Sequence, residues 1–193
     1  MFKLLLQPIS ISLILLFLTS TLYAGEYEKI VGQNVYSFSQ VDAFGNQFDI
    51  NDYIGKKMVI SIGDKKSDIK KSLWNDWKNL YKFSKDTVFI NIYFPGGISF
   101  TVPRGEVVHR IRKMINKRKS EILNSVSYEK RKFLNSLDIH WIIDWKRRIS
   151  GRFHAPRHTI ISFFIDKNGI IRDYYTYNEN SLDNFFKTVN EFQ

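Results

Sequence analysis

The stretch TIISFFIDKNGIIRDYY (Thr159–Tyr175) decides the fold of this chain of 193 residues. Two runs rich in apolar and β-branched residues, Thr159–Ile165 and Ile170–Tyr175, flank the polar tetrapeptide Asp166–Gly169. Asp, Asn and Gly favour a tight turn because they tolerate positive φ angles and because Asp and Asn bond to their own backbone. The pattern therefore predicts a β-hairpin in the last quarter of the sequence.

Further strands are predicted upstream of this hairpin. Short apolar runs bounded by turn residues are typical of buried strands, and Gly45–Asn46 between two alternating runs indicates a second hairpin. The predicted strands are Val35–Val41 and Gln47–Ile50, which form the N-terminal hairpin, and then Met58–Ile62, Thr87–Phe94 and Ile139–Ile143.

Three segments carry apolar residues at spacings of three and four, which predicts helices that each pack one stripe on a sheet. The stripes are Ile69, Leu73, Trp77 and Leu80; then Val107, Ile111, Ile115 and Ile122, in a helix from about Pro103 to Ser125; and Leu182, Phe185, Phe186 and Val189, in a helix capped by Ser181. The order of elements predicts an α/β fold, in which helices sandwich a mixed sheet that carries an N-terminal hairpin and an inserted long basic helix.

Residues 1–24 have the layout of a secretory signal peptide. Lys3 gives a positive start, Ile9–Leu18 is apolar except for two serines, and Ala24–Gly25 offers a small-residue cleavage site. If the signal is not removed, Leu4–Tyr23 is just long enough to anchor the chain in a bilayer. Residues 25–193 contain no repeat and no linker, so we expect a single exported domain, periplasmic or associated with the envelope.

The composition excludes several kinds of chemistry. The chain has no cysteine, and 29 Lys and Arg against 19 Asp and Glu give a net charge of +10. Without cysteine it cannot form disulfides, catalyse thiol exchange or build a zinc finger. It also lacks the G-x-S-x-G, HExxH and Walker motifs of other enzymes. We therefore predict a non-catalytic protein without catalytic residues.

Two motifs resemble a known superfamily. Phe48 and Ile50, followed by Tyr53–Lys57 and the strand Met58–Ile62, are similar to the opening of extracytoplasmic thioredoxin-like and peroxiredoxin-like proteins. The hairpin Ser162–Ile171 resembles the one that follows in the same superfamily. The resemblance implies a thioredoxin-like fold for residues 25–193.

The chain departs from this superfamily where its chemistry is performed. The resemblance implies reactive cysteines between the first core strand and the first helix, and here that segment is Gly63–Ser72, without sulfur. It also implies a cis-proline before the hairpin, where this chain has Ile160, with Pro156 displaced upstream. The chain keeps the features of the scaffold, but the loop that would carry the redox cysteines has none. This combination favours a binding or assembly factor over an enzyme.

Copper handling is a second hypothesis. His158 precedes the hairpin at the place where the resemblance to Sco-type copper chaperones implies a histidine ligand. Thiolates are the soft ligands that select Cu(I), and none is present. His154 is a second imidazole nearby, although Pro156 argues against a helix that would align the two. The alternative is that both histidines are ordinary polar residues before a strand and bind no metal.

The excess of positive charge falls in two clusters, one on the predicted long helix and one before the C-terminal hairpin. The candidate residues for an anionic partner are Arg110, Arg112, Lys113, Lys117 and Arg118, and then Lys146, Arg147, Arg148, Arg152 and Arg157. Nucleic acid is a poor candidate for the partner of an exported protein, and anionic lipid headgroups, acidic polysaccharide or an acidic protein face are better candidates. A solvated helix surface remains the alternative, and an anionic membrane surface gives a third functional hypothesis.

Overall fold

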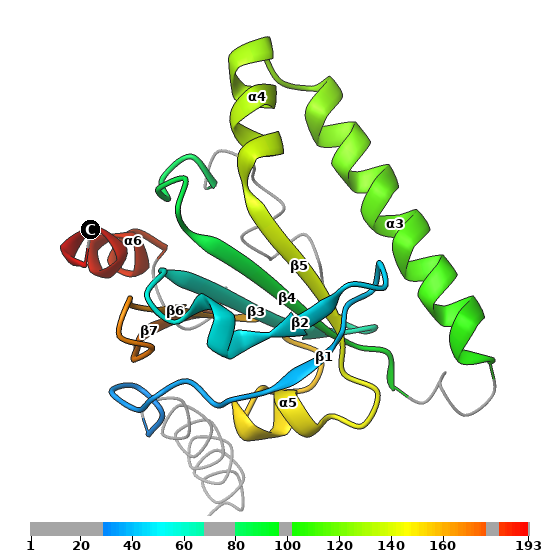
Figure 1. Cartoon of the computed structure of the whole chain (residues 1–193), viewed down its shortest axis with the longest axis horizontal. Helices are drawn as coiled ribbons and strands as arrows, with labels where there is room; N and C mark the ends of the chain where they lie inside the picture. The colour runs from blue at the N-terminus through cyan, green and yellow to red at the C-terminus, as the bar shows by residue number, and fades with distance from the viewer. Residues whose placement is uncertain (1–28, 68–79, 97–101, 177–181, 193) are drawn as a thin grey trace, which may run out of the picture.

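A five-stranded mixed sheet forms the centre of the computed structural model, which describes residues 29–67, 80–96, 102–176 and 182–192 (Figure 1). The strands are β3 (Met58–Asp64), β4 (Val88–Phe94), β5 (Asp138–Ile143), β6 (Ile161–Ile165) and β7 (Ile171–Thr176), in the order β5-β4-β3-β6-β7. β4 runs parallel to both β3 and β5, whereas β6 is antiparallel to β3 and to β7. The structure confirms the predicted strands, the C-terminal hairpin and the mixed α/β class.

Both faces of this sheet are apolar. Side chains alternate between the two faces along each strand, and consecutive residues of β3, β4 and β6 are buried. On one face, Ile60, Ile90 and Phe163 are fully buried. The N-terminal hairpin, which consists of β1 (Ser39–Val41) and β2 (Gln47–Asp49), packs there with the short helices η1 (Ile50–Tyr53) and α5 (Arg148–Arg152). We call it the hairpin face.

The opposite face, here called the helix face, is covered by α6 (Leu182–Glu191) and by residues that follow the first predicted helix. Val59, Phe89 and Phe164 contribute its sheet side, and Phe185 of α6 packs against them. Polar side chains interrupt it at one level: the hydroxyl oxygens of Ser61 and Ser162 lie 2.8 Å apart, where β3 and β6 pair in register, and the buried Asn91 of β4 lies beside Ser61. The two hydroxyls satisfy each other, which removes the penalty of burying either one alone.

The long basic helix α3 (Arg104–Asn124) runs beside β5 at the edge of the sheet (Figure 1). Val107, Ile111 and Ile115 are its buried residues, and they form a satellite core with Ile143 of β5. The helix ends where the sequence indicated, with Ser125 as its C-terminal cap.

Two α-helices were not predicted, namely α4 (Tyr128–Ser136) and α5, and neither was the short 3₁₀ helix η1. α4 buries only Leu134, and α5 is five residues long, so neither displays an apolar stripe in the sequence. Several predictions lie outside the described residues: the signal segment 1–24, most of the helix expected over Ile69–Leu80, and the cap at Ser181. Leu80 itself is buried. Within the described ranges, no helix combines the length and hydropathy that a bilayer crossing requires.

Candidate functional site

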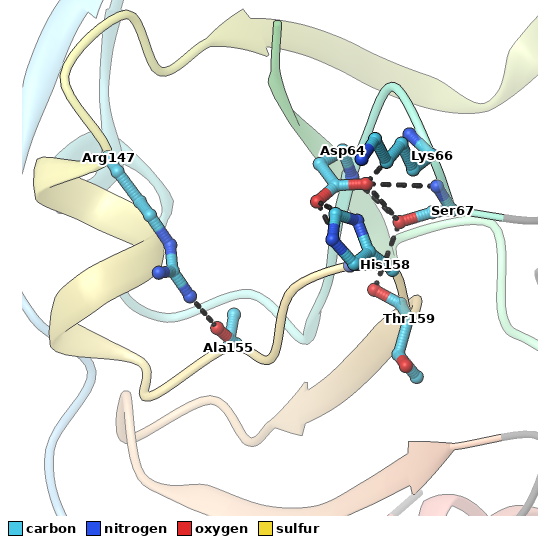
Figure 2. A network of polar contacts seen from close by, with 7 residues as sticks. All are labelled: Asp64, Lys66, Ser67, Arg147, Ala155, His158 and Thr159. Carbon is cyan, nitrogen blue, oxygen red and sulfur yellow. Dashed lines mark hydrogen bonds and ion pairs between the residues drawn. The ribbon is translucent and has the colours of Figure 1, made fainter. Parts of the chain in front are cut away.

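The loop that follows β3 is folded around the carboxylate of Asp64. Its Oδ1 accepts hydrogen bonds from the backbone N–H groups of Lys66 (2.8 Å) and Ser67 (2.9 Å), and the backbone N–H of Asp64 donates to Ser67 Oγ (2.9 Å) (Figure 2). Such reciprocal bonds between an Asp and a Ser three residues later are typical of a tight turn closed by side chains.

The same carboxylate also holds the loop that precedes β6. The backbone N–H of His158 donates to Asp64 Oδ2 (2.9 Å), and the ring Nδ1 of His158 lies 3.2 Å from that oxygen. The hydroxyl of Ser67 lies 3.2 Å from the carbonyl oxygen of Thr159 and 3.1 Å from Asp64 Oδ1, and either oxygen can accept its proton. Asp64 therefore joins two loops that are far apart in the sequence (Figure 2).

The surroundings of Asp64 favour its ionised form. Burial opposes ionisation, but the hydrogen bonds from His158, Lys66 and Ser67, together with the charge of His158, outweigh burial and lower the pKa of Asp64 below its ordinary value. The nearby phenol of Tyr93 responds in the opposite sense, because burial and the charge of Asp64 both raise the pKa of Tyr93. The site thus holds a fixed negative charge at neutral pH.

This arrangement does not resemble a nucleophilic triad. In a triad the base accepts the proton of the nucleophile and the carboxylate orients the base. Here the hydroxyl of Ser67 contacts Asp64 and Thr159, while the imidazole of His158 contacts only Asp64 among the described residues. Ser67 is accordingly a structural group of the turn.

His154 and His158 were the predicted metal ligands. Both adopt positive φ angles, +49° and +65°, in the same loop. Among the described residues, no group of three or more His, Cys, Asp or Glu side chains is placed to hold a metal ion. Copper binding stays a prediction that rests on these two imidazoles, one of which already contacts Asp64.

The predicted basic residues of α3 lie along an exposed helix and are partly paired. Arg110 forms an ion pair with Glu106, and Arg118 lies 3.3 Å from Glu121. Arg112 donates to the carbonyl oxygen of Ala43 in the turn of the N-terminal hairpin. Lys113 and Lys117 are exposed.

The second basic cluster is divided by the structure. Lys146, Arg148 and Arg152 line a cleft of about 360 Å³, whereas the guanidinium of Arg147 donates to the carbonyl oxygen of Ala155 (Figure 2) and Arg157 is exposed outside the cleft. The complete lining is Tyr36–Gln40, Arg104, Asp144–Lys146, Arg148, Ile149 and Arg152.

Arg104 belongs to the basic cluster of the long helix, but the sequence does not indicate that it lies beside the second cluster. The sequence analysis missed the hairpin residues of this cleft, because they are about a hundred residues away from α5 in the sequence.

Several solved structures share this fold. The chain is similar to the pneumococcal exposed lipoprotein thioredoxin Etrx1 from Streptococcus pneumoniae, with 15% identity and a TM-score of 0.54 over 81% of this chain and 99% of that one. It is also similar to a secreted Mycobacterium tuberculosis disulfide oxidoreductase homologous to E. coli DsbE, with 13% identity and a TM-score of 0.53 over 80% and 95% of the two chains. The chain has a thioredoxin-like fold.

This thioredoxin-like fold extends to peroxiredoxins. A Plasmodium vivax 2-Cys peroxiredoxin matches with 12% identity and a TM-score of 0.54, over 84% of this chain and 95% of that one. No family model matches the sequence, and no curated protein matches it. At these identities the likeness concerns the fold.

Within the thioredoxin-like fold, the Asp64–Ser67 turn occupies the place where the resemblance implied reactive cysteines. Ile160 lies where a cis-proline was implied, and the described residues contain no cis peptide bond. A side chain added at Gly63 would lie only 3.1 Å from Ile160 Cγ1, so the end of β3 and the loop before β6 are in close contact. The chain therefore combines a thioredoxin-like fold with a turn that has no thiol.

Proposed function

We propose that this chain is an exported, non-catalytic thioredoxin-like protein that acts as a binding or assembly factor in the cell envelope. The observation that carries the proposal is the Asp64 network, because hydrogen bonds now close the loop where thiols would act. A chain without cysteine cannot exchange disulfides, so the retained scaffold is more useful for binding than for redox catalysis.

Export is the second part of the proposal. It is supported by the signal-like segment at residues 1–24 and by the exposed or secreted similar proteins named above. Mass spectrometry of the protein recovered from the envelope fraction tests it, and a chain that begins at Gly25 is the expected result. A full-length chain in the membrane fraction would indicate an uncleaved anchor, and recovery only from the cytoplasm would contradict export.

Site-specific photo-crosslinking in the native cells tests the binding role. A photoreactive residue replaces one exposed side chain at a time, on different elements. The positions are Ser39 in β1, Lys113 in α3, Tyr128 in α4 and His158 before β6. A discrete protein adduct that forms at one position and is absent at the others supports the proposal, because a true interface is local. The same faint pattern at every position, or no adduct at any, contradicts it.

A further inference from the structure

The cleft beside the N-terminal hairpin carries an uncompensated positive charge. Arg104, Lys146, Arg148 and Arg152 contribute four cations to its lining, and the only acidic residue there is Asp144. Among the described residues, none of the four lies within ion-pair distance of a carboxylate. The cleft therefore attracts anions, and its low-dielectric walls strengthen that attraction.

Asp144 offsets only one of the four positive charges, and its oxygens accept hydrogen bonds from neutral groups rather than from these cations. Oδ1 accepts the backbone N–H of Arg148 (2.9 Å), and Oδ2 accepts both the backbone N–H and the hydroxyl of Ser150 (2.8 Å each). Its side chain is buried, with a relative exposure of 3%. Asp144 thus fixes the start of α5 and leaves the guanidinium of Arg148 exposed to solvent.

One wall of the cleft is a strand edge. The backbone N–H of Ile50 donates to the carbonyl oxygen of Phe38, and that of Asp42 donates to the carbonyl oxygen of Asn46. Because bonded and non-bonded pairs alternate in an antiparallel ladder, the pair Ser39–Asp49 between them is non-bonded. The backbone N–H and C=O of Ser39 consequently point away from β2.

On either side of Ser39, backbone groups of this outward edge form hydrogen bonds with other elements. The backbone N–H of Ala43 donates to the carbonyl oxygen of Trp141 in β5 (2.6 Å), and the carbonyl oxygen of Ser37 accepts from Arg152 Nη1 (3.2 Å). Ser39 lies between them and lines the cleft, and the described residues provide no partner for its outward groups. Figure 1 shows β1 beside α5, which supplies the basic wall.

We propose that this cleft binds an extended acidic peptide segment of the envelope partner, added as a strand to the outer edge of β1. The proposal rests on the binding role above and names the chemistry of the partner. In this mode the peptide backbone pairs with Ser39, and alternate side chains of the peptide face the same way. Alternate carboxylates then meet Arg148 and Arg152, while the stacked Arg104 and Trp145, 5.3 Å apart, close the end of the cleft.

Fluorescence anisotropy with a labelled peptide of alternating Glu and Thr tests this proposal on the protein purified from the envelope fraction. The Lys146→Gln, Arg148→Gln double variant should weaken binding about tenfold, since it removes two of the four cations that line the cleft. The matched control Lys113→Gln, Lys117→Gln removes the same charge from α3 and should leave the affinity within about twofold. Equal weakening by both double variants would mean a general charge effect and would overturn the proposal.

The role of the peptide backbone is tested without altering the protein. Two versions of the probe are N-methylated, one at the odd and one at the even amides. Because strand addition uses alternate amides, one version should lose binding and the other should keep it. If both bind as well as the parent probe, strand addition is wrong.

Two further ligands separate peptides from other anions. Oligogalacturonate and phosphatidylglycerol vesicles, at the same charge concentration, should displace the probe much less well than the unlabelled peptide. If either displaces the probe equally well, the cleft is a polysaccharide or lipid site and the peptide proposal is overturned. The crosslinking experiment distinguishes the two proposals: an adduct at Tyr128 but none at Ser39 would leave the binding role intact and place it elsewhere.

Discussion

At Asp64 one carboxylate receives hydrogen bonds from two loops, and its replacement should therefore affect stability in a pH-dependent way. In Asp64→Asn one oxygen becomes an NH₂ group that faces N–H donors, so we expect a loss of about 1–3 kcal/mol in the free energy of unfolding at pH 7. Folding lowers the pKa of Asp64, so the stabilisation by its ionised form is complete above the unfolded-state pKa of about 3.9. It disappears as the pH falls through the lower pKa of the folded protein.

Urea unfolding between pH 7 and pH 2.5 measures this effect. The gap between wild type and Asp64→Asn should narrow as the pH falls below about 4. Asp52→Asn, at an exposed position in η1, makes the same change of charge and should show little effect at any pH. A gap that stays constant with pH would mean that the ionised state of Asp64 is not what stabilises the loops.

Among the elements, the hairpin of β6 and β7 depends most directly on its turn. Gly169 has a φ angle of +77°, and a side chain there would lie 2.8 Å from Ile54 Cδ1. Gly45, in the N-terminal hairpin, has a φ angle of +96° and nothing within 4 Å. Alanine at either position is strained by about 1–2 kcal/mol, and only Gly169→Ala adds a steric contact. Thermal unfolding should therefore show a larger loss for Gly169→Ala, and equal losses would indicate that Ile54 moves freely.

These elements also show what a sequence reveals about the fold. The strand β3 and the hairpin of β6 and β7 were predictable because apolar runs and turn residues are local signals. The helix α5 was not, since tertiary contacts of Asp144 rather than an apolar stripe fix its start. Only part of the Asp64 network could be predicted from the sequence. Its Asp-x-x-Ser spacing is local, but the contribution of His158 depends on the packing of two distant loops.

For the whole molecule, the sheet connects both cores, so we expect one cooperative unfolding transition. β3, β4 and β6 contribute side chains to the hairpin face and to the helix face alike. Far-UV circular dichroism and tryptophan fluorescence should give coincident urea transitions in a Trp74→Phe, Trp77→Phe variant, whose fluorescence reports only on the two remaining tryptophans, Trp141 and Trp145 at the β5 edge. An earlier transition in fluorescence alone would show that α3 and the β5 edge unfold as a separate unit.

The charge of the whole molecule has a defined distribution on the described surface. The cations of α3 lie along an exposed helix and are partly paired, whereas those around α5 converge on a cleft. The sequence predicted both clusters but could not distinguish them, because each has a similar density of Lys and Arg. Convergence in space separates a candidate binding site from a solvated surface.

The buried pair of Ser61 and Ser162 has a consequence for how the chain finds its fold. β3 and β6 are about a hundred residues apart, and apolar alternation repeats every two residues, so a slip of two residues would keep every side chain on its correct face. Such a slip would set Ser61 opposite Ile160 or Phe164 and separate the two hydroxyls, at about 1–3 kcal/mol for a hydroxyl that is left buried without a partner. The hydrogen bond between the two serines thus favours the native register of β3 and β6 over shifted registers that would bury the apolar side chains equally well.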